Sequence, residues 1–138
     1  MEDERLLEEA RSAMVSAYAP YSGFRVGAAL VASDDTVWTG CNVENASYGL
    51  TMCAERVAVF GAVSAGRRAF RALTLVTEAD EAVPPCGACL QVLSEFSPEL
   101  TVLSVGLGTR RTWILSELLP ERFGGSPSWL SRTDEKDK

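Results

Sequence analysis

The chain has 138 residues and a net charge of −6, with 46% apolar and 23% charged residues. This composition is typical of one globular domain and argues against fibrous, disordered or membrane-spanning proteins. It contains 13 Lys and Arg residues without a basic run, which disfavours binding to a long nucleic acid, and no histidine, which excludes histidine-based catalysis and histidine metal ligands. The acidic start, where a signal peptide would be basic, predicts a cytoplasmic protein.

Segments with helical and strand-like patterns alternate along the chain. The expected elements, in chain order, are a helix at 2–18, a hairpin of strands at 24–32 and 36–41, a loop at 42–50, a helix at 53–65 capped by Thr51, a strand at 70–77, an acidic loop at 78–83, a helix at 86–96, strands at 100–105 and 110–114, and a helical turn at 116–120. This order predicts an α/β fold in which helices flank a central mixed five-stranded sheet. We expect one domain over 1–138, with about 126–138 as a loose C-terminal tail.

Two short cysteine runs, CAE at 53–55 and PCGAC at 85–89, carry the chemistry. The thiolates of Cys53, Cys86 and Cys89 suit zinc, and three protein ligands leave one coordination position open for water. Glu55 is then placed to move the protons of that water. Both runs fall where a helix begins, where the partial positive charge favours thiolates and side chains two residues apart can converge. Arg56 is the candidate cation that offsets the excess sulfur charge.

Two other interpretations use the same cysteines. Cys86 and Cys89 have the spacing of a thioredoxin-like redox pair, although the pair follows the third strand rather than opening an early βαβ unit. Alternatively, Cys41 joins the other three in a closed structural zinc site, which makes the chain a binding module and leaves Glu55 without a role.

The CAE and PCGAC runs resemble the C-x-E and P-C-x-x-C signature of the zinc nucleoside deaminases. The runs YSGFRVGAA at 21–29 and GCNVENASYG at 40–49 resemble blocks of the small homotetrameric cytidine deaminase family, and the likeness extends from about Ala19 to Phe123. It implies a three-layer cytidine-deaminase-like fold, one Zn²⁺ per subunit, and a hydrolase of pyrimidine salvage. The implied reaction is deamination of cytidine or deoxycytidine by attack of zinc-activated water on C4, with Glu55 as the proton shuttle.

The resemblance also implies substrate contacts. In this family's pattern Phe24 stacks on the base, while Asn42 and Glu44 hold the ribose 3′-hydroxyl. The remaining implied contacts are the Ala54 backbone at the base carbonyl, the backbone at Pro84 and Cys86 beside the reacting amino group, and Ala46, Tyr48 and Phe123 at the site of a neighbouring subunit. The functional unit is therefore expected to be a homotetramer that binds a small pyrimidine nucleoside, with no nucleic-acid or membrane partner.

The chain departs from the family pattern at two positions. Leu90 follows Cys89 where the family usually has arginine, which leaves Arg56 as the nearby cation. Pro84 stands where a small polar residue is usual, so N4-substituted cytidines become candidate substrates. Deamination of a related compound such as a blasticidin-like antibiotic is the alternative reaction within the same fold.

Overall fold

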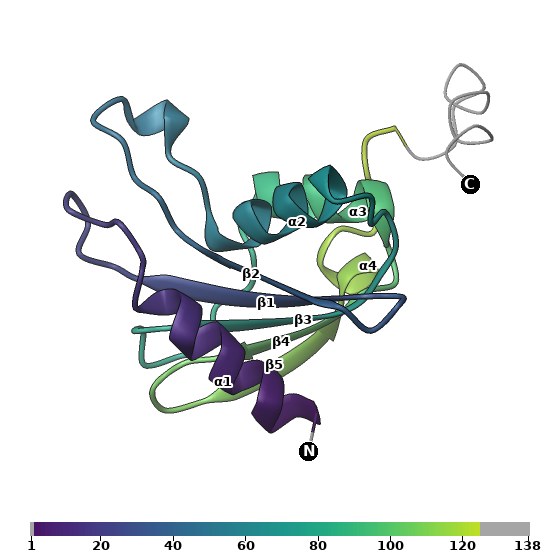
Figure 1. The fold of residues 1–138 in the computed structure, drawn as a ribbon, viewed down its shortest axis with the longest axis horizontal. Coiled ribbons are helices and arrows are strands. Elements are labelled where there is room, and N and C mark those ends of the chain that lie inside the picture. The colour runs from purple at the N-terminus through teal and green to yellow at the C-terminus, as the bar shows by residue number, and fades with distance from the viewer. Residues whose placement is uncertain (1, 125–138) are drawn as a thin grey trace.

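A mixed five-stranded sheet forms the centre of the computed structural model, which describes residues 2–124 of the chain (Figure 1). The strand order is β2-β1-β3-β4-β5, and only β3 and β4 run parallel to each other. The elements are α1 (Glu2–Met14), β1 (Val26–Ala32), β2 (Val37–Cys41), the 3₁₀ helix η1 (Tyr48–Leu50), α2 (Ala54–Ser64), β3 (Phe70–Thr77), α3 (Gly87–Phe96), β4 (Thr101–Val105), β5 (Arg110–Ile114) and α4 (Leu115–Leu118). Within these residues no helix has both the length and the apolar character needed to span a membrane.

Helices cover both faces of the sheet, so the molecule has three layers (Figure 1). Strand β1 is buried on both sides because its side chains alternate between two cores. Ala28 and Leu30 belong to the core beneath α2 and α3, whereas Ala29 and Val31 pack with Leu7 of α1. This double burial explains why β1 is a continuous apolar run rather than an alternating one.

Two glycines let the helices approach the sheet closely. A Cβ at Gly40 of β2 would overlap the carbonyl oxygen of Ala54 and lie 2.7 Å from the Ala58 nitrogen. A Cβ at Gly27 of β1 would similarly overlap the carbonyl oxygen of Ala10 in α1. Glycine at position 40 therefore allows the first turn of α2 to rest directly on the sheet.

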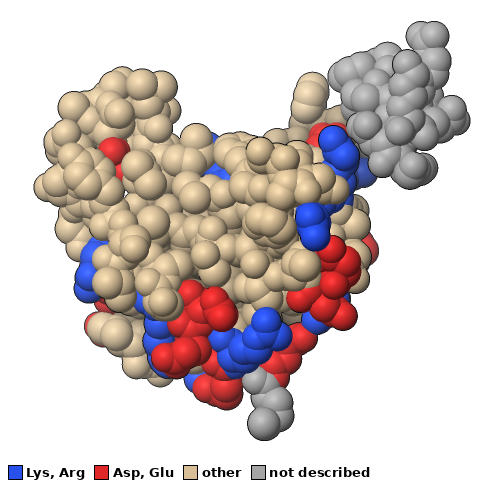
Figure 2. All heavy atoms as spheres, viewed as in Figure 1, with Lys and Arg blue, Asp and Glu red and all other residues tan. Residues whose placement is uncertain are grey.

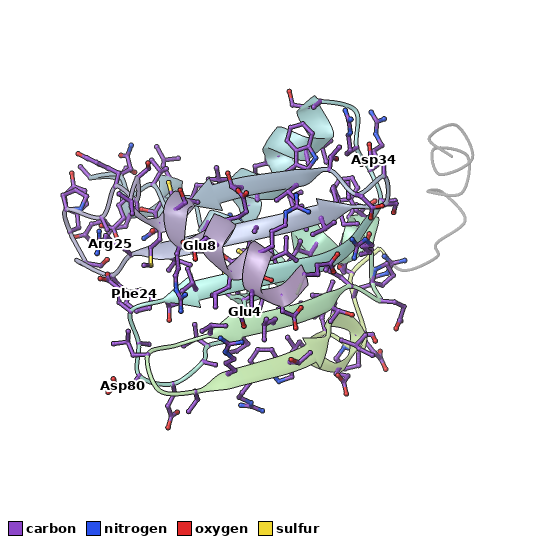
Figure 3. All side chains as sticks on the ribbon, turned by 60° about the horizontal axis from the view of Figure 1, so that its bottom comes forward. Glu4, Glu8, Phe24, Arg25, Asp34 and Asp80 are labelled. Carbon is purple, nitrogen blue, oxygen red and sulfur yellow. The ribbon has the colours of Figure 1, made fainter. Side chains whose placement is uncertain are left out.

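Three loops leave the sheet at the same end. The register pairs Gly27 with Cys41 and Val26 with Thr77, so the start of β1 and the ends of β2 and β3 lie side by side. The loops at 15–25, 42–53 and 78–86 consequently begin or finish at one edge of the molecule. Figure 3 shows Phe24 at this end and Asp34, in the β1–β2 turn, at the opposite end.

The expected α/β fold with helices around a mixed five-stranded sheet is confirmed, and several boundaries are corrected. The first helix ends at Met14 rather than at residue 18, because Tyr18 donates its N–H to the carbonyl of Asn42 and joins a short bridge with Val43. Strand β1 begins at 26, not 24. Thr51 does not cap α2; its hydroxyl accepts from the Asn45 N–H. The expected tail at 126–138 lies outside the described residues.

Candidate active site

The three cysteines of the two runs meet where α2 and α3 begin. Cys53 and Cys86 are the N-cap residues of these helices, and Cys89 lies in the first turn of α3. The Sγ atoms of Cys53 and Cys86 are 3.7 Å apart, those of Cys86 and Cys89 are 3.5 Å apart, and all three lie within 4.8 Å of one another. Tetrahedral zinc with Zn–S bonds of about 2.3 Å requires sulfurs roughly 3.8 Å apart. The cluster fits zinc.

The cluster is open on one side. Cys89 is buried and Cys53 half-buried, whereas Cys86 is exposed to solvent. Cys41, in β2, is not part of the ligand group, which contains three residues. The arrangement therefore leaves a fourth coordination position for water, as in catalytic zinc sites, and the closed four-cysteine interpretation is not favoured.

Glu55 is a buried carboxyl in the first turn of α2, only 5% exposed. Burial raises the pKa of the Glu55 carboxyl to about 7, and the negative charge of Cys53 adds to this rise. Cys89 interacts with the same carboxyl. A carboxyl with a pKa near neutrality next to the ligand sulfurs can both accept and donate a proton, which is the requirement for acid–base catalysis.

Arg56 provides the positive charge at the sulfurs. Its Nη2 donates to the Sγ of Cys53 at 3.3 Å. Hydrogen bonds from Cys89 and then from Arg56 lower the pKa of the Cys53 thiol to about 5, whereas Cys89, which donates to Cys53 and is buried, has a raised pKa. The Nε of Arg56 is buried without a hydrogen-bond partner among the described residues. Leu90, at the position where the family usually has arginine, is 8% exposed and packs into the core. Its side chain therefore adds no charge near the cluster.

The residues expected to bind the nucleoside lie on the loops at the same end of the sheet. One Glu44 oxygen accepts the N–H groups of Tyr21 and Ser22 at 3.0 and 3.1 Å, and the other accepts the Ser22 hydroxyl. Asn42 accepts from the Val26 N–H at 2.9 Å and donates to the Phe24 carbonyl at 2.7 Å. Phe24, Asn42 and Glu44 are thus brought together through the segment that precedes β1.

The other predicted contact residues lie at four places in the fold. Ala54 is fully buried at the start of α2, and Pro84 is exposed in the loop before α3. Ala46, Tyr48 and Phe123 are exposed; the Tyr48 ring lies edge-on to Tyr21 at 5.8 Å, and the Phe123 carbonyl accepts from Gln91 of α3 at 3.1 Å. In this single chain these three side chains point to solvent.

Two serines support the site and had no predicted role. The hydroxyl of Ser104, a fully buried residue of β4, donates to the Val83 carbonyl at 2.6 Å and so fixes the loop that leads to Cys86. Ser22 lies within the run at 21–29, two residues before Phe24 and opposite Glu44. Its short hydroxyl side chain near a turn was the available signal, but only the fold shows which groups it reaches.

Charge is unevenly distributed over the surface. On the face in Figure 2, acidic and basic side chains gather over the lower and right-hand parts of the molecule, whereas the upper left, where the loop at 42–53 projects, shows little charge. The large apolar side chains exposed on the loops at 15–25 and 42–53 are Val15, Tyr18, Tyr21, Phe24, Val43, Tyr48 and Leu50. These two loops therefore present an apolar surface at the end of the sheet where the loop at 42–53 leads into Cys53.

Three sulfurs at two helix starts, a buried carboxyl beside them and a mixed α/β sheet define a catalytic zinc protein. The chain matches the family model of the cytidine and deoxycytidylate deaminase zinc-binding region over residues 1–105. Cytidine deaminases of Sporosarcina psychrophila and Halalkalibacterium halodurans are 53% and 49% identical over 125 residues, which cover 89% of this chain and 92% and 95% of the relatives. The crystal structure of cytidine deaminase from Burkholderia pseudomallei superposes with a TM-score of 0.85 at 49% identity, covering 89% of this chain and all of that one. This chain belongs to the cytidine and deoxycytidylate deaminase family, and its metal is zinc.

Proposed function

We propose that this protein catalyses the hydrolytic deamination of cytidine and deoxycytidine to uridine and deoxyuridine. The observation that carries the proposal is the open cluster of three sulfurs with a buried carboxyl of raised pKa beside it. The family assignment supports the same reaction, and the relatives with 49% and 53% sequence identity are named cytidine deaminases. The antibiotic-deaminase and structural-zinc alternatives have no comparable support in the described site.

In the proposed mechanism, Cys53, Cys86 and Cys89 hold Zn²⁺, which when bound acidifies a water molecule beside them. Glu55 accepts the proton of this water and passes it to N3 of the pyrimidine ring, which makes C4 electrophilic. The hydroxide left by that water would add to C4 and form the new C–O bond. Glu55 then takes the remaining proton of this hydroxyl and delivers it to the amino group, so that the C4–N bond breaks, ammonia leaves and the C4 carbonyl of the uridine product forms. A buried carboxyl beside the ligand sulfurs can accept a proton from the water and donate it to the substrate. Arg56 offsets the excess charge of the sulfurs.

The proposed nucleoside contacts follow from the loops. Phe24, 37% exposed, offers a ring face to the base, and Glu44 and Asn42 receive the ribose 3′-hydroxyl. Asn42 uses its carbonyl and one N–H on the backbone, which leaves one amide proton for the sugar. The backbone at Ala54 would contact the base carbonyl, and the backbone at Pro84 and Cys86 would flank the amino group.

We propose further that the active form is a homotetramer whose sites are shared between subunits. Tyr48 and Phe123 are 74% and 78% exposed, and Ala46 is exposed on the same apolar loop as Tyr48, which supports burial of these residues against another chain. Light scattering coupled to gel filtration is expected to report four chains. A monomer with full activity would contradict this part. We place the enzyme in the cytoplasm, in pyrimidine salvage.

The central test is the change in ultraviolet absorbance when the purified protein is mixed with cytidine or deoxycytidine. We expect turnover that is lost on zinc chelation and restored by added Zn²⁺. A zinc-loaded, folded protein that leaves both nucleosides unchanged would contradict the proposal. Blasticidin S in the same assay would then test the alternative substrate.

Pro84 supports a broader substrate range at C4. It lacks a backbone N–H, is exposed, and lies in the loop before Cys86, so this position offers neither a backbone donor nor a polar side chain to the N4 group. We propose that N4-alkyl and N4-acyl cytidines are also hydrolysed. The Pro84→Ser variant, assayed beside the wild type, should shift preference towards the unsubstituted amine. Strict selectivity of the wild type for cytidine would contradict this extension.

A further inference from the structure

The Glu44 carboxylate has little hydrogen-bonding capacity left. An ionised carboxylate accepts about four hydrogen bonds. In this structure Oε1 accepts the N–H groups of Tyr21 and Ser22, and Oε2 accepts the Ser22 hydroxyl. These bonds, with that from the Ser22 hydroxyl contributing most, lower the pKa of Glu44, so the group is ionised at neutral pH. One acceptor position remains, on Oε2, where one further hydroxyl can bind.

Ser22 determines where that remaining position lies. Its single hydroxyl proton is donated to Glu44 Oε2, so the direction of this bond sets the orientation of the carboxylate. Its oxygen also accepts the backbone N–H of Phe24 at 3.0 Å. One side chain therefore connects the acidic residue with the aromatic residue two positions further along the chain.

The backbone of Phe24 depends on such side-chain contacts. Phe24 precedes β1, which begins at Val26, so it has no place in the ladder of the sheet. Its N–H is bound by Ser22, and its carbonyl accepts from Asn42 Nδ2 at 2.7 Å. Figure 3 shows Phe24 at the loop end of the sheet, next to Arg25. Arg25 is in turn paired with Glu78 at 3.0 Å, which fixes the following residue.

We propose that Ser22 is a positioning residue for the sugar. It orients Glu44 so that Oε2 accepts the ribose 3′-hydroxyl. Phe24 keeps its second backbone bond, to Asn42, when the Ser22 hydroxyl is absent, so the contact of its ring with the base does not depend on Ser22. The inference rests on the proposed function, because it assigns Ser22 a part in nucleoside selection. Ser22 contacts neither the metal ligands nor Glu55 in the described structure, so its effect falls on binding rather than on the chemical step.

The test compares cytidine with 3′-deoxycytidine in the zinc-loaded wild type and in Ser22→Ala. Loss of one hydrogen bond to a charged group should raise the KM for cytidine about 5- to 10-fold, with kcat within about two-fold of the wild type. The KM for 3′-deoxycytidine should change little, because that substrate lacks the hydroxyl that Glu44 receives. The preference for the 3′-hydroxyl therefore falls about 5- to 10-fold.

Two further variants make the result specific. Ser22→Thr keeps the hydroxyl and should restore the preference for cytidine. Ser33→Ala removes a serine hydroxyl from the turn at the far end of the sheet and should match the wild type. Calorimetric binding of uridine and 3′-deoxyuridine gives the same comparison without turnover, and zinc content and Tm verify that each variant is folded.

The outcomes separate this inference from the proposed function. Suppose that the wild type converts cytidine, but Ser22→Ala raises the KM of cytidine and of 3′-deoxycytidine equally, or lowers kcat and leaves KM unchanged. The positioning role is then wrong and the deaminase function stands. If the wild type has no zinc-dependent activity on cytidine and binds uridine no better than 3′-deoxyuridine, both are wrong. Failure of Ser22→Thr to restore the preference also contradicts the hydroxyl's role.

Discussion

The cysteine cluster and the loops proposed to bind the nucleoside are stabilised in different ways. The metal half (Cys53, Glu55, Arg56, Cys86 and Cys89) lies on two helix starts packed against the main core. The loop half (residues 19–25 and 42–50) projects beyond the sheet, is mostly exposed, and is held by side-chain bonds to backbone groups. Changes in the first half should therefore affect catalysis, zinc or stability, and changes in the second should affect substrate affinity.

The largest effect is expected at Glu55. Glu55→Gln keeps the shape of the side chain but removes its ability to carry protons, so kcat should fall about 10²- to 10⁴-fold. Zinc content should stay at the wild-type value, because Glu55 is not among the sulfur ligands. Glu95→Gln, an exposed change on α3, is the matched control. Steady-state kinetics with metal analysis would contradict the assignment if Glu55→Gln stayed active or lost its zinc.

The zinc content of single cysteine variants distinguishes the three cysteines of the cluster from Cys41. Cys89→Ser removes a buried ligand, so we expect a folded chain that retains little zinc, has a lower Tm and shows no turnover. Cys41→Ser should keep zinc and activity because Cys41 is outside the cluster. Atomic absorption after gel filtration provides the measurement. Zinc loss in Cys41→Ser would support a four-cysteine site instead.

The close packing of α2 on β2 gives a stability effect. A methyl group at Gly40 would overlap the Ala54 carbonyl, which is backbone and cannot rotate away. Gly40→Ala should lower the free energy of unfolding by about 3 kcal/mol and weaken zinc retention, since α2 carries Cys53. Gly61→Ala, where a Cβ meets nothing within 4 Å, is the control. Chemical denaturation of the two variants tests this. Equal free energies of unfolding would show that α2 can move away from β2 without destabilising the fold.

The smallest effect on stability is expected in the loop half. Tyr48→Ala removes an exposed ring that has one aromatic contact, with Tyr21, so the loss should be about 1 kcal/mol. Zinc content should not change, whereas the KM for cytidine should rise because the proposed shared site loses a side chain. Thermal unfolding and kinetics on one preparation measure both. Loss of zinc on this change would show that the two halves are not separable.

The sequence predicted the metal half of the site more completely than the loop half. The helix and strand order and the three zinc ligands could be predicted, because apolar periodicity and cysteine spacing are local signals. The role of Ser22 could not be predicted, since it depends on a contact with Glu44, 22 positions away. The prediction that Thr51 caps α2 is wrong, because the presence of a good capping side chain does not show where the helix begins. Here Cys53 is the N-cap, and its side chain accepts no hydrogen bond from the first turn.

The turn between β1 and β2 has a practical consequence for protein engineering. It lies at the end of the sheet opposite Phe24, and the seven residues of β1 separate the two ends by about 20 Å. Asp34 and Asp35 in this turn form exposed ion pairs with Arg67 and Arg71, which contribute little stability. A dye, an affinity tag or a surface-immobilisation handle inserted here would label or anchor the protein at the end of the sheet away from the loops proposed to bind the nucleoside.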